Sequence, residues 1–228
     1  MSRPSTGTRV LLLRHAETAA PDRYHGSESD IALGPRGLEQ AEGAAQGLIR
    51  LGPTALYSSA MLRARQTAGP IARTLGLEAI VVPALHERIM GPLGGMLQSE
   101  GRARYVASME AWKAGDLAAT HEGGESYLQI RDRVVPPFLA LARSHPGETI
   151  VVVAHGMVIR VLLSDLLGGP GPAAFDGFGI DYVAINDLRF DGQAWLAAAL
   201  NRPVGELEAK GESGPGPLDN LPGGSGAS

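Results

Sequence analysis

The segment that most constrains the fold is residues 149–154, TIVVVA, which are apolar or β-branched throughout without alternating with polar residues. A short, unbroken run of this kind is typical of a strand that is buried on both faces of a sheet. Residues 10–13 and 80–82 show the same pattern, and residues 55–57 show a weaker version of it. We therefore expect a sheet that is covered on both sides.

Helical patterns lie between these runs. Apolar residues recur at spacings of three and four over residues 38–48, and residues 61–75 follow two serines, Ser58 and Ser59, either of which could cap a helix. Further helices are expected over residues 127–142 and 157–167. Because strands and helices alternate along the chain, the sequence predicts an α/β fold, a three-layer α/β/α sandwich with a mainly parallel central sheet.

The end of the pattern is different. Residues 183–190 and 195–200 are separated by Asp191-Gly192, which favours a closing β-hairpin. From Pro203 onward the chain is rich in Gly, Pro, Ser and Glu and loses its apolar pattern. We expect residues 203–228 to form a disordered, low-complexity tail.

Composition limits the possible functions. Hydrophobic residues make up 44% of the 228 residues, enough for a substantial core, and cysteine is absent, which excludes disulfides and thiolate metal sites and suits the cytoplasm. A net charge of −4 argues against a broad nucleic-acid surface but leaves room for a local cationic pocket. No stretch approaches the roughly 20 apolar residues of a membrane span, and the run at residues 10–13 is shorter than the about 7–15 residues of a signal-peptide core. We expect a cytoplasmic protein that binds neither membrane nor nucleic acid.

Two histidines follow predicted strands. Arg14-His15 follows the first run, and His155-Gly156 follows the run at 149–154 and precedes a helix. In open α/β sheets ligands bind beyond the carboxyl ends of the strands. An Arg-His pair alone could be an ordinary surface turn, but a second histidine in an equivalent place favours a site. Gly156 permits close backbone approach, and the start of the helix offers N–H groups to an anion.

A further cationic group comes from Arg63, near the start of the helix that follows residues 55–57. Arg65 lies about 200° around that helix, so we assign it to the solvated face. A metal ion between His15 and His155 would be repelled by the neighbouring arginines. No metal site and no cofactor are expected.

These segments resemble the histidine phosphatase superfamily, also called the phosphoglycerate mutase-like family. The resemblance covers roughly residues 9–200 and runs in the family's order. Its motifs are Arg14-His15-Ala16-Glu17-Thr18, Ser58-Ser59 with residues 63–68 (RARQTA), an acidic loop at residues 85–91 followed by Gly94-Gly95, Gly-Gly-Glu-Ser at residues 123–126, and His155-Gly156. Each motif is weak alone, whereas five in sequence are specific.

The resemblance implies a role for each residue. His15 is the nucleophile and becomes phosphorylated, Arg14, Arg63 and His155 surround the phosphoryl oxygens, and Glu87 donates a proton to the leaving oxygen and then activates water. The chemistry agrees, because phosphoryl transfer depends on positioning and on cationic stabilisation of the equatorial oxygens. His15 must attack as the neutral imidazole, since an imidazolium has no free lone pair.

The resemblance also implies substrate contacts in the neighbouring loops, although the chain departs from the family pattern there. Ala16 replaces the usual glycine, and Pro21 stands where the family often has an asparagine. The expected substrate-binding residues are Arg14, Thr18, His25, Gly26, Arg63, His155 and Gly156.

Other residues of reactive type have no partner at metal-ligand spacing. We expect His86, His121 and His145 to be solvated loop residues, with His121, close to Gly123-Gly124, the strongest exception. Trp112 and Trp195 are expected to pack in the core.

The leading hypothesis is a phosphomonoester phosphatase, with one domain over residues 1–202, a small lid over about 88–125, and a small-molecule phosphomonoester as its partner. The alternatives are a cofactor-dependent phosphoglycerate mutase and a non-catalytic module that binds a phosphorylated ligand. A mutase needs extra cationic groups after the acidic loop, and here that stretch contains only Arg102, Arg104 and Lys113. Since residues two apart diverge on a helix, Arg102 and Arg104 are not expected to clamp one group together. The oligomeric state is not indicated.

Overall fold

The computed structural model describes residues 7–168 and 171–207. Its centre is a six-stranded sheet in the order β3-β2-β4-β1-β5-β6. β1, β4, β2 and β3 run parallel to one another, β5 is antiparallel to β1, and β6 is antiparallel to β5. The predicted mainly parallel sheet and closing hairpin are therefore confirmed. The strands are β1 Thr8–Arg14, β2 Ala55–Ser58, β3 Ala79–Val81, β4 Thr149–Ala154, β5 Ile185–Phe190 and β6 Trp195–Arg202.

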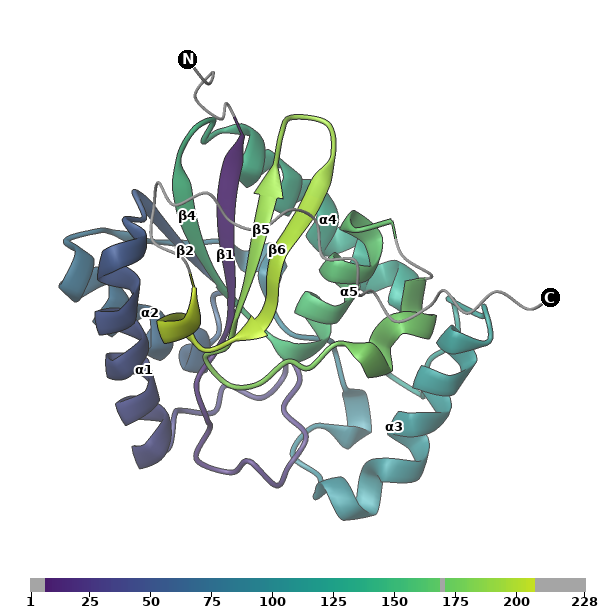
Figure 1. The fold of residues 1–228 in the computed structure, drawn as a ribbon. Coiled ribbons are helices and arrows are strands. Elements are labelled where there is room, and N and C mark those ends of the chain that lie inside the picture. The colour runs from purple at the N-terminus through teal and green to yellow at the C-terminus, as the bar shows by residue number, and fades with distance from the viewer. Residues whose placement is uncertain (1–6, 169–170, 208–228) are drawn as a thin grey trace.

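Helices cover both faces of this sheet, so that the molecule has three layers. α1 and α2 lie on one side and α4 and α5 on the other, while α3 stands beyond the lower ends of the strands (Figure 1). The helices are α1 Pro35–Leu48, α2 Leu62–Leu75, α3 Gln98–Lys113, α4 Tyr127–Arg143 and α5 Gly156–Leu166. Among the residues that the structure describes, no helix is both long and apolar enough to cross a membrane.

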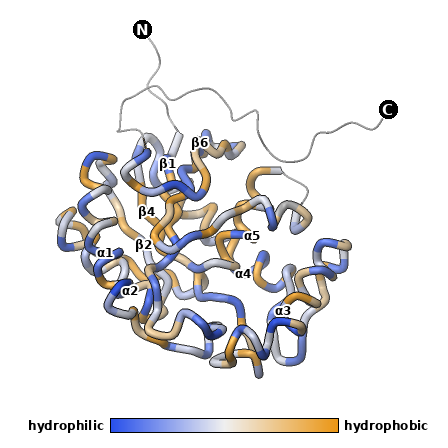
Figure 2. The backbone as a smooth tube through the Cα atoms, turned by 60° about the horizontal axis from the view of Figure 1, so that its bottom comes forward, coloured by the Kyte–Doolittle hydropathy of each residue, from blue (hydrophilic) through white to orange (hydrophobic). Residues whose placement is uncertain are grey.

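The unbroken apolar runs are explained by two hydrophobic clusters. In β1, Leu11 and Leu13 belong to the cluster that contains residues of α1 and α2, whereas Val10 and Leu12 belong to the cluster that contains residues of α4 and α5. β4 divides in the same way, because successive side chains of a strand point to opposite faces. In Figure 2 the hydrophobic colour gathers around β4 and α5 in the middle of the molecule.

The expectation for residues 80–82 was wrong in one respect. They belong partly to a strand, β3, but this strand lies at the edge of the sheet, where Ile80 and Val81 are 45% and 44% exposed. An apolar run of three residues does not distinguish an edge strand from a central one. Leu38, expected on the apolar face of α1, is likewise exposed, and the helix begins earlier, at Pro35.

The tail was expected to begin at Pro203, and the structure places its start later. Residues Val204–Glu206 form a short 3-10 turn, and Leu207 is buried in the cluster below α1 and α2. The guanidinium of Arg50 donates to the carbonyl of Val204 at 2.7 Å. A single apolar residue among Gly and Glu gives no periodic signal, so the sequence did not reveal this contact. Residues 208–228 lie outside the described residues.

The segment that was expected to form a lid, about residues 88–125, contains α3 and is joined to the core. Trp112 is buried and its ring contacts those of Tyr127 and Phe175. Trp195 stacks on Phe138 and Phe190, so both tryptophans pack as expected. A lid movement of this segment stays a prediction.

Candidate active site

The carboxyl ends of β1 and β4 bring the two predicted histidines together. The strands are parallel neighbours in a register that pairs Arg14 with Ala154, and the next residues along the chain are His15 and His155. Their ring centroids are 5.1 Å apart, and the backbone N–H of His15 donates to the carbonyl of Ala154. The juxtaposition inferred from the sequence is present.

His15 is held with one ring nitrogen engaged. Its Nδ1 lies 2.7 Å from the carbonyl oxygen of Ala16, which can only accept, so Nδ1 carries the proton and Nε2 keeps its lone pair. Burial lowers the pKa of His15 well below 6.5, and the charges of Arg14 and Arg63 lower it further. The imidazole is therefore neutral near pH 7, and Nε2 keeps a free lone pair.

His155 is fully buried behind His15. Its Nε2 lies 2.8 Å from the hydroxyl of Ser59, which also accepts from the backbone N–H of Met61 at 3.3 Å. Its Nδ1 is buried and has no hydrogen-bond partner among the described residues. Burial lowers the pKa of His155 well below 6.5, and Arg63 and His15 add to this effect.

The role of Ser59 differs from the one expected. The N-cap position of α2 is occupied by Met61, whose side chain makes no capping hydrogen bond. The backbone N–H of Leu62 donates instead to the carboxylate of Asp30, at 2.7 Å. Ser59 holds His155 instead. Propensity favoured a cap, but only the tertiary structure brings His155 alongside.

Arg14 lies beside His15 with one side of its guanidinium free. Its Nη1 donates to the carbonyl of Ile180 at 2.6 Å, and the guanidinium lies 4.1 Å from the ring centroid of Tyr182. Its Nε is buried without a partner among the described residues. This charge is available to an anion next to His15.

Arg63 is completely buried and binds a loop. Its Nη1 donates to the carbonyl of Ser29 at 2.8 Å, and its Nη2 donates to those of His25 and Gly26 at 3.2 and 3.3 Å. Its Nε has no partner among the described residues. Arg63, which was expected to bind phosphate, therefore fixes the backbone of residues 25–29, and its contact with phosphate stays a prediction. Arg65 is exposed, as predicted.

Glu87 is oriented by two backbone N–H groups. Its Oε1 accepts from the N–H of Arg88 at 2.8 Å, and its Oε2 accepts from the N–H of Met157 at 3.2 Å, in the first turn of α5. A Cβ added at Gly156 would lie 3.7 Å from the guanidinium of Arg14 and 3.9 Å from Glu87, so the glycine lies between the two groups. Glu87, Arg14 and the first turn of α5 are therefore close together.

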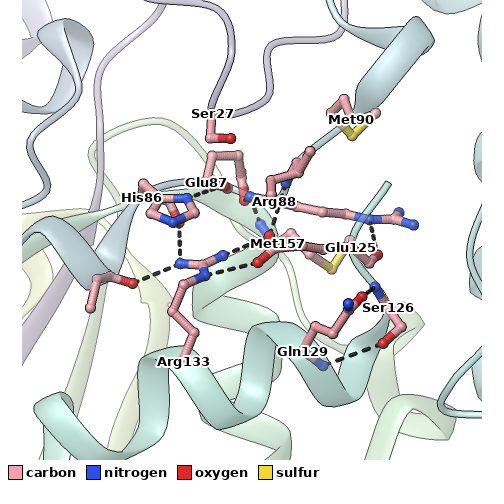
Figure 3. A network of polar contacts seen from close by, with 12 residues as sticks. Ser27, His86, Glu87, Arg88, Met90, Glu125, Ser126, Gln129, Arg133 and Met157 are labelled. Carbon is pink, nitrogen blue, oxygen red and sulfur yellow. Dashed lines mark hydrogen bonds and ion pairs between the residues drawn. The ribbon is translucent and has the colours of Figure 1, made fainter. Parts of the chain in front are cut away.

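The chain on either side of Glu87 is held by a network that Figure 3 shows. Arg133 of α4 donates to the carbonyls of Ala84 and His86 at 2.6 and 2.9 Å and forms a bidentate ion pair with Glu125. Glu125 also accepts from the N–H of Ile89, and its carbonyl accepts from the Nε of Arg88. These contacts fix residues 84–89, and with them the carboxylate of Glu87.

These side chains surround a cavity of about 320 Å³. Of the predicted site residues, six line it: Arg14, His15, Thr18, His25, Glu87 and Gly156. Arg63, His155 and Gly26 are not among the lining residues. The charge of Arg63 lowers the pKa of His15, and the ring of His155 contacts that of His15. The hydroxyl of Thr18 is buried without a partner among the described residues.

Sequence reasoning missed several lining residues. Arg160 follows Gly156 by four positions on α5, so helical spacing from the His-Gly motif could have found it. Tyr182 lies 5.8 Å from His15, centroid to centroid, and comes from the loop before β5. It has no local signal, because the pairing of β5 with β1 places it there. Arg23, Arg102 and Tyr105 also line the cavity.

The remaining histidines are half-buried and bonded rather than solvated. His86 donates to the carbonyl of Glu87, His121 contacts the carbonyl of Met90, and His145 contacts the hydroxyl of Tyr57. Among the residues that the structure describes, no group of three His, Asp or Glu side chains is placed to hold a metal ion. Metal independence stays a prediction.

The model of the histidine phosphatase superfamily (branch 1) matches residues 10–203. The chain belongs to this superfamily. The histidine phosphatase is 34% identical over 211 residues to a metal-independent phosphoserine phosphatase of Arabidopsis thaliana, covering 88% of this chain and 86% of the relative. It is 35% identical to a 2,3-bisphosphoglycerate-dependent phosphoglycerate mutase of Methylobacterium radiotolerans, covering 70% and 79%.

A solved structure agrees with this assignment. A mycobacterial glucosyl-3-phosphoglycerate phosphatase in complex with VO3 superposes with a TM-score of 0.76 at 28% identity, covering 86% of this histidine phosphatase and 99% of that chain. The expected fold and superfamily are thus confirmed.

Proposed function

We propose that this histidine phosphatase hydrolyses a phosphomonoester of a small phosphorylated metabolite, through a phosphohistidine on His15. The observation that carries the proposal is the state of His15: Nδ1 is bonded to the Ala16 carbonyl, and burial beside arginines lowers the pKa of the ring. Nε2 is thus an unprotonated nitrogen with a free lone pair at the wall of a cationic cavity. We also propose that the enzyme works in the cytoplasm and without a metal or other cofactor.

The proposed reaction has two steps. Nε2 of His15 attacks phosphorus while the bond to the ester oxygen breaks, and Glu87 gives that oxygen its proton, so that the alcohol leaves. Water then attacks the phosphohistidine, its proton passes to Glu87, and inorganic phosphate leaves His15 free. Arg14 and Arg63 supply positive charge to the phosphoryl oxygens, and neutral His155 supplies a hydrogen-bond donor.

The two nitrogens of His155 suit this role. The hydroxyl of Ser59 accepts from Met61, so its own hydrogen can be donated to Nε2 of His155. The proton of the neutral ring would then lie on Nδ1, the nitrogen that has no partner among the described residues. We propose that this N–H donates to a phosphoryl oxygen.

Hydrolysis is favoured over the mutase alternative by the phosphatases among the relatives. The phosphoserine phosphatases of Arabidopsis thaliana and Hydrogenobacter thermophilus match 88% and 85% of this chain, and the superposed mycobacterial structure is that of a phosphatase. A non-catalytic binding module would need neither an unprotonated nitrogen at His15 nor an oriented carboxylate at Glu87.

The test mixes the enzyme with a phosphomonoester whose phosphorus is labelled and measures the label that stays bound after quenching. Label on a phosphohistidine should be labile in acid and stable in base. The wild-type enzyme should trap label on quenching and release inorganic phosphate, whereas His15→Ala should do neither. His145→Gln is the matched control, because His145 lies beside Thr8 at the opposite end of β1. Labelling of His15→Ala would refute the assignment, and phosphoglycerate interconversion that depends on a bisphosphate primer and outpaces phosphate release would show a mutase.

A further inference from the structure

The turn before β5 contains a strained residue. Val183 has a φ of 54°, and Asn201 is the only other described non-glycine residue with a positive φ. The backbone N–H of Ala184 donates to the carbonyl of Asp181 at 3.3 Å, so Val183 is the third residue of a four-residue turn. Glycine or asparagine is usual where that position has a positive φ, and a β-branched residue there is a marked outlier. Such an outlier persists only where the surrounding structure imposes it, and outliers of this kind cluster at active sites.

Hydrogen bonds from two strands impose this conformation. Toward β1, the N–H of Val183 donates to the carbonyl of Arg14 at 3.1 Å, and the N–H of Arg14 donates to the carbonyl of Ala184 at 3.4 Å. Toward β6, Oδ1 of Asn201 accepts from the N–H of Asp181 at 2.7 Å, and Nδ2 of Asn201 donates to the carboxylate of Asp181 at 2.9 Å. The turn is therefore fixed between the strand that carries Arg14 and the last strand of the sheet.

The second residue of this turn, Tyr182, lies against the guanidinium of Arg14. The centroid of its ring is 4.1 Å from Cζ of Arg14 and 5.8 Å from the ring centroid of His15. The carbonyl of Ile180 accepts from Nη1 of the same arginine at 2.6 Å, whereas its Nε is buried without a partner among the described residues. Residues 180–182 thus give Arg14 one hydrogen bond and an aromatic face, and leave its Nε–H available.

We propose that Tyr182 is a positioning residue, which holds the guanidinium of Arg14 in the orientation that phosphoryl transfer to His15 requires. The proposal rests on the proposed function of the cavity. An aromatic face attracts a guanidinium without accepting its in-plane N–H groups, so these stay free for phosphoryl oxygens. A carboxylate in the same place would occupy those donors. The strain at Val183 follows from this task, because the chain must turn from the ring over Arg14 into β5, which pairs with β1 from Ile185 onward.

The test measures the turnover of p-nitrophenyl phosphate and the binding of inorganic phosphate by calorimetry. Tyr182→Leu should lower kcat/KM and weaken phosphate binding, each about tenfold, because the guanidinium loses its aromatic support. Tyr182→Phe keeps the ring and should recover most of both losses. In an Arg14→Met background, Tyr182→Leu should lower kcat/KM by less than about twofold, because a residue that acts through Arg14 has no effect once that charge is removed. A further tenfold loss in that background would overturn the proposal.

The strained turn is tested by comparing glycine with alanine at Val183. Both substitutions remove the packing of the valine side chain, but only glycine adopts a positive φ without strain. Val183→Gly should therefore unfold at a higher urea concentration than Val183→Ala, and its kcat/KM should nevertheless be lower, because a freer turn holds Tyr182 less firmly. Val81 of β3 is the matched control, since it is exposed and its φ is not positive. There glycine should be the less stable of the two, with kcat/KM unchanged.

The two readouts separate this proposal from the proposed function. Phosphate binding without turnover in the wild type would contradict hydrolysis, and the Tyr182 variants would still test the support of Arg14 through binding. Wild-type affinity for phosphate in Tyr182→Leu would overturn the positioning role even if the enzyme is a phosphatase. A lower urea midpoint for Val183→Gly than for Val183→Ala would overturn the role of the turn.

Discussion

At the scale of single residues, hydrogen bonds decide which atoms are reactive. The carbonyl of Ala16 fixes the proton of His15 on Nδ1, and the hydroxyl of Ser59 occupies Nε2 of His155. Glu87 is oriented in a comparable way, by the N–H groups of Arg88 and Met157. Each of the two histidines thus has a neighbour that leaves one ring nitrogen available for chemistry, whereas both oxygens of Glu87 accept a backbone N–H.

Glu87→Gln tests the proposed proton donor. The amide cannot give up a proton, so kcat for an alkyl phosphate should fall about 10²–10⁴-fold, the usual contribution of general acid catalysis. The rate constant of the first step with p-nitrophenyl phosphate should fall much less, because its leaving group needs no proton. Burst-phase kinetics with both esters measure this difference, and Glu122→Gln, on an exposed loop residue, is the control. Equal reductions in the rate constant of the first step for both esters would show that Glu87 only positions the substrate.

At the scale of elements, helices are fixed by what packs against them. α1 contains two glycines in its later turns, Gly43 and Gly47. A Cβ at Gly43 would meet nothing within 4 Å, whereas a Cβ at Gly47 would lie 2.3 Å from Cγ1 of Val204. Residues 204–207 can therefore pack against α1 only because Gly47 has no side chain.

This pair gives opposite expectations for the same substitution. Gly43→Ala should stabilise the protein by about 0.5–1 kcal/mol, because glycine within a helix costs backbone entropy. Gly47→Ala should destabilise it by about 1–3 kcal/mol, because the methyl group overpacks against Val204. Urea unfolding measures both changes in the free energy of unfolding. Equal stabilisation by both substitutions would mean that residues 204–207 do not pack on α1 as described.

At the scale of the whole molecule, buried histidines connect the site with global stability. Burial lowers the pKa of His15 and of His155 well below 6.5, and it also lowers the pKa of His25 and His121. The unfolded chain therefore binds protons near pH 6.5, while the folded chain binds them only at lower pH. Stability rises with pH wherever the unfolded state holds more protons, so it must fall as the pH drops through 6.5.

The free energy of unfolding should therefore be lower at pH 5.5 than at pH 7.5, with each such histidine contributing up to about 1.4 kcal/mol per pH unit. Urea unfolding at the two pH values measures the slope. His155→Gln should make the slope shallower by about one histidine's share, whatever its effect on stability at pH 7.5. Identical slopes in the wild type and the variant would contradict the lowered pKa of His155.

The sequence by itself determined the layered fold and the histidine pair. Runs buried on both faces at residues 10–13 and 149–154 require a covered parallel sheet, and parallel strands bring the residues after them to one edge, here His15 and His155. These signals are local and periodic, so they can be read from the chain alone. Arg63 could be selected from its place near the start of a helix that follows a strand, whereas Glu87 could be assigned only through the motifs of the superfamily.

Only the tertiary structure decided the partners of these residues. Ser59 binds His155 rather than capping a helix, Arg63 fixes the loop at residues 25–29, and Arg160 shares a cavity with Arg102. Each contact joins segments that are far apart in the chain, and its energy depends on burial and distance, which no local pattern encodes. The burial of Leu207 also has no local signal. This residue is the only apolar one in its stretch of the sequence after Val204, and it is buried in the cluster that contains residues of α1 and α2.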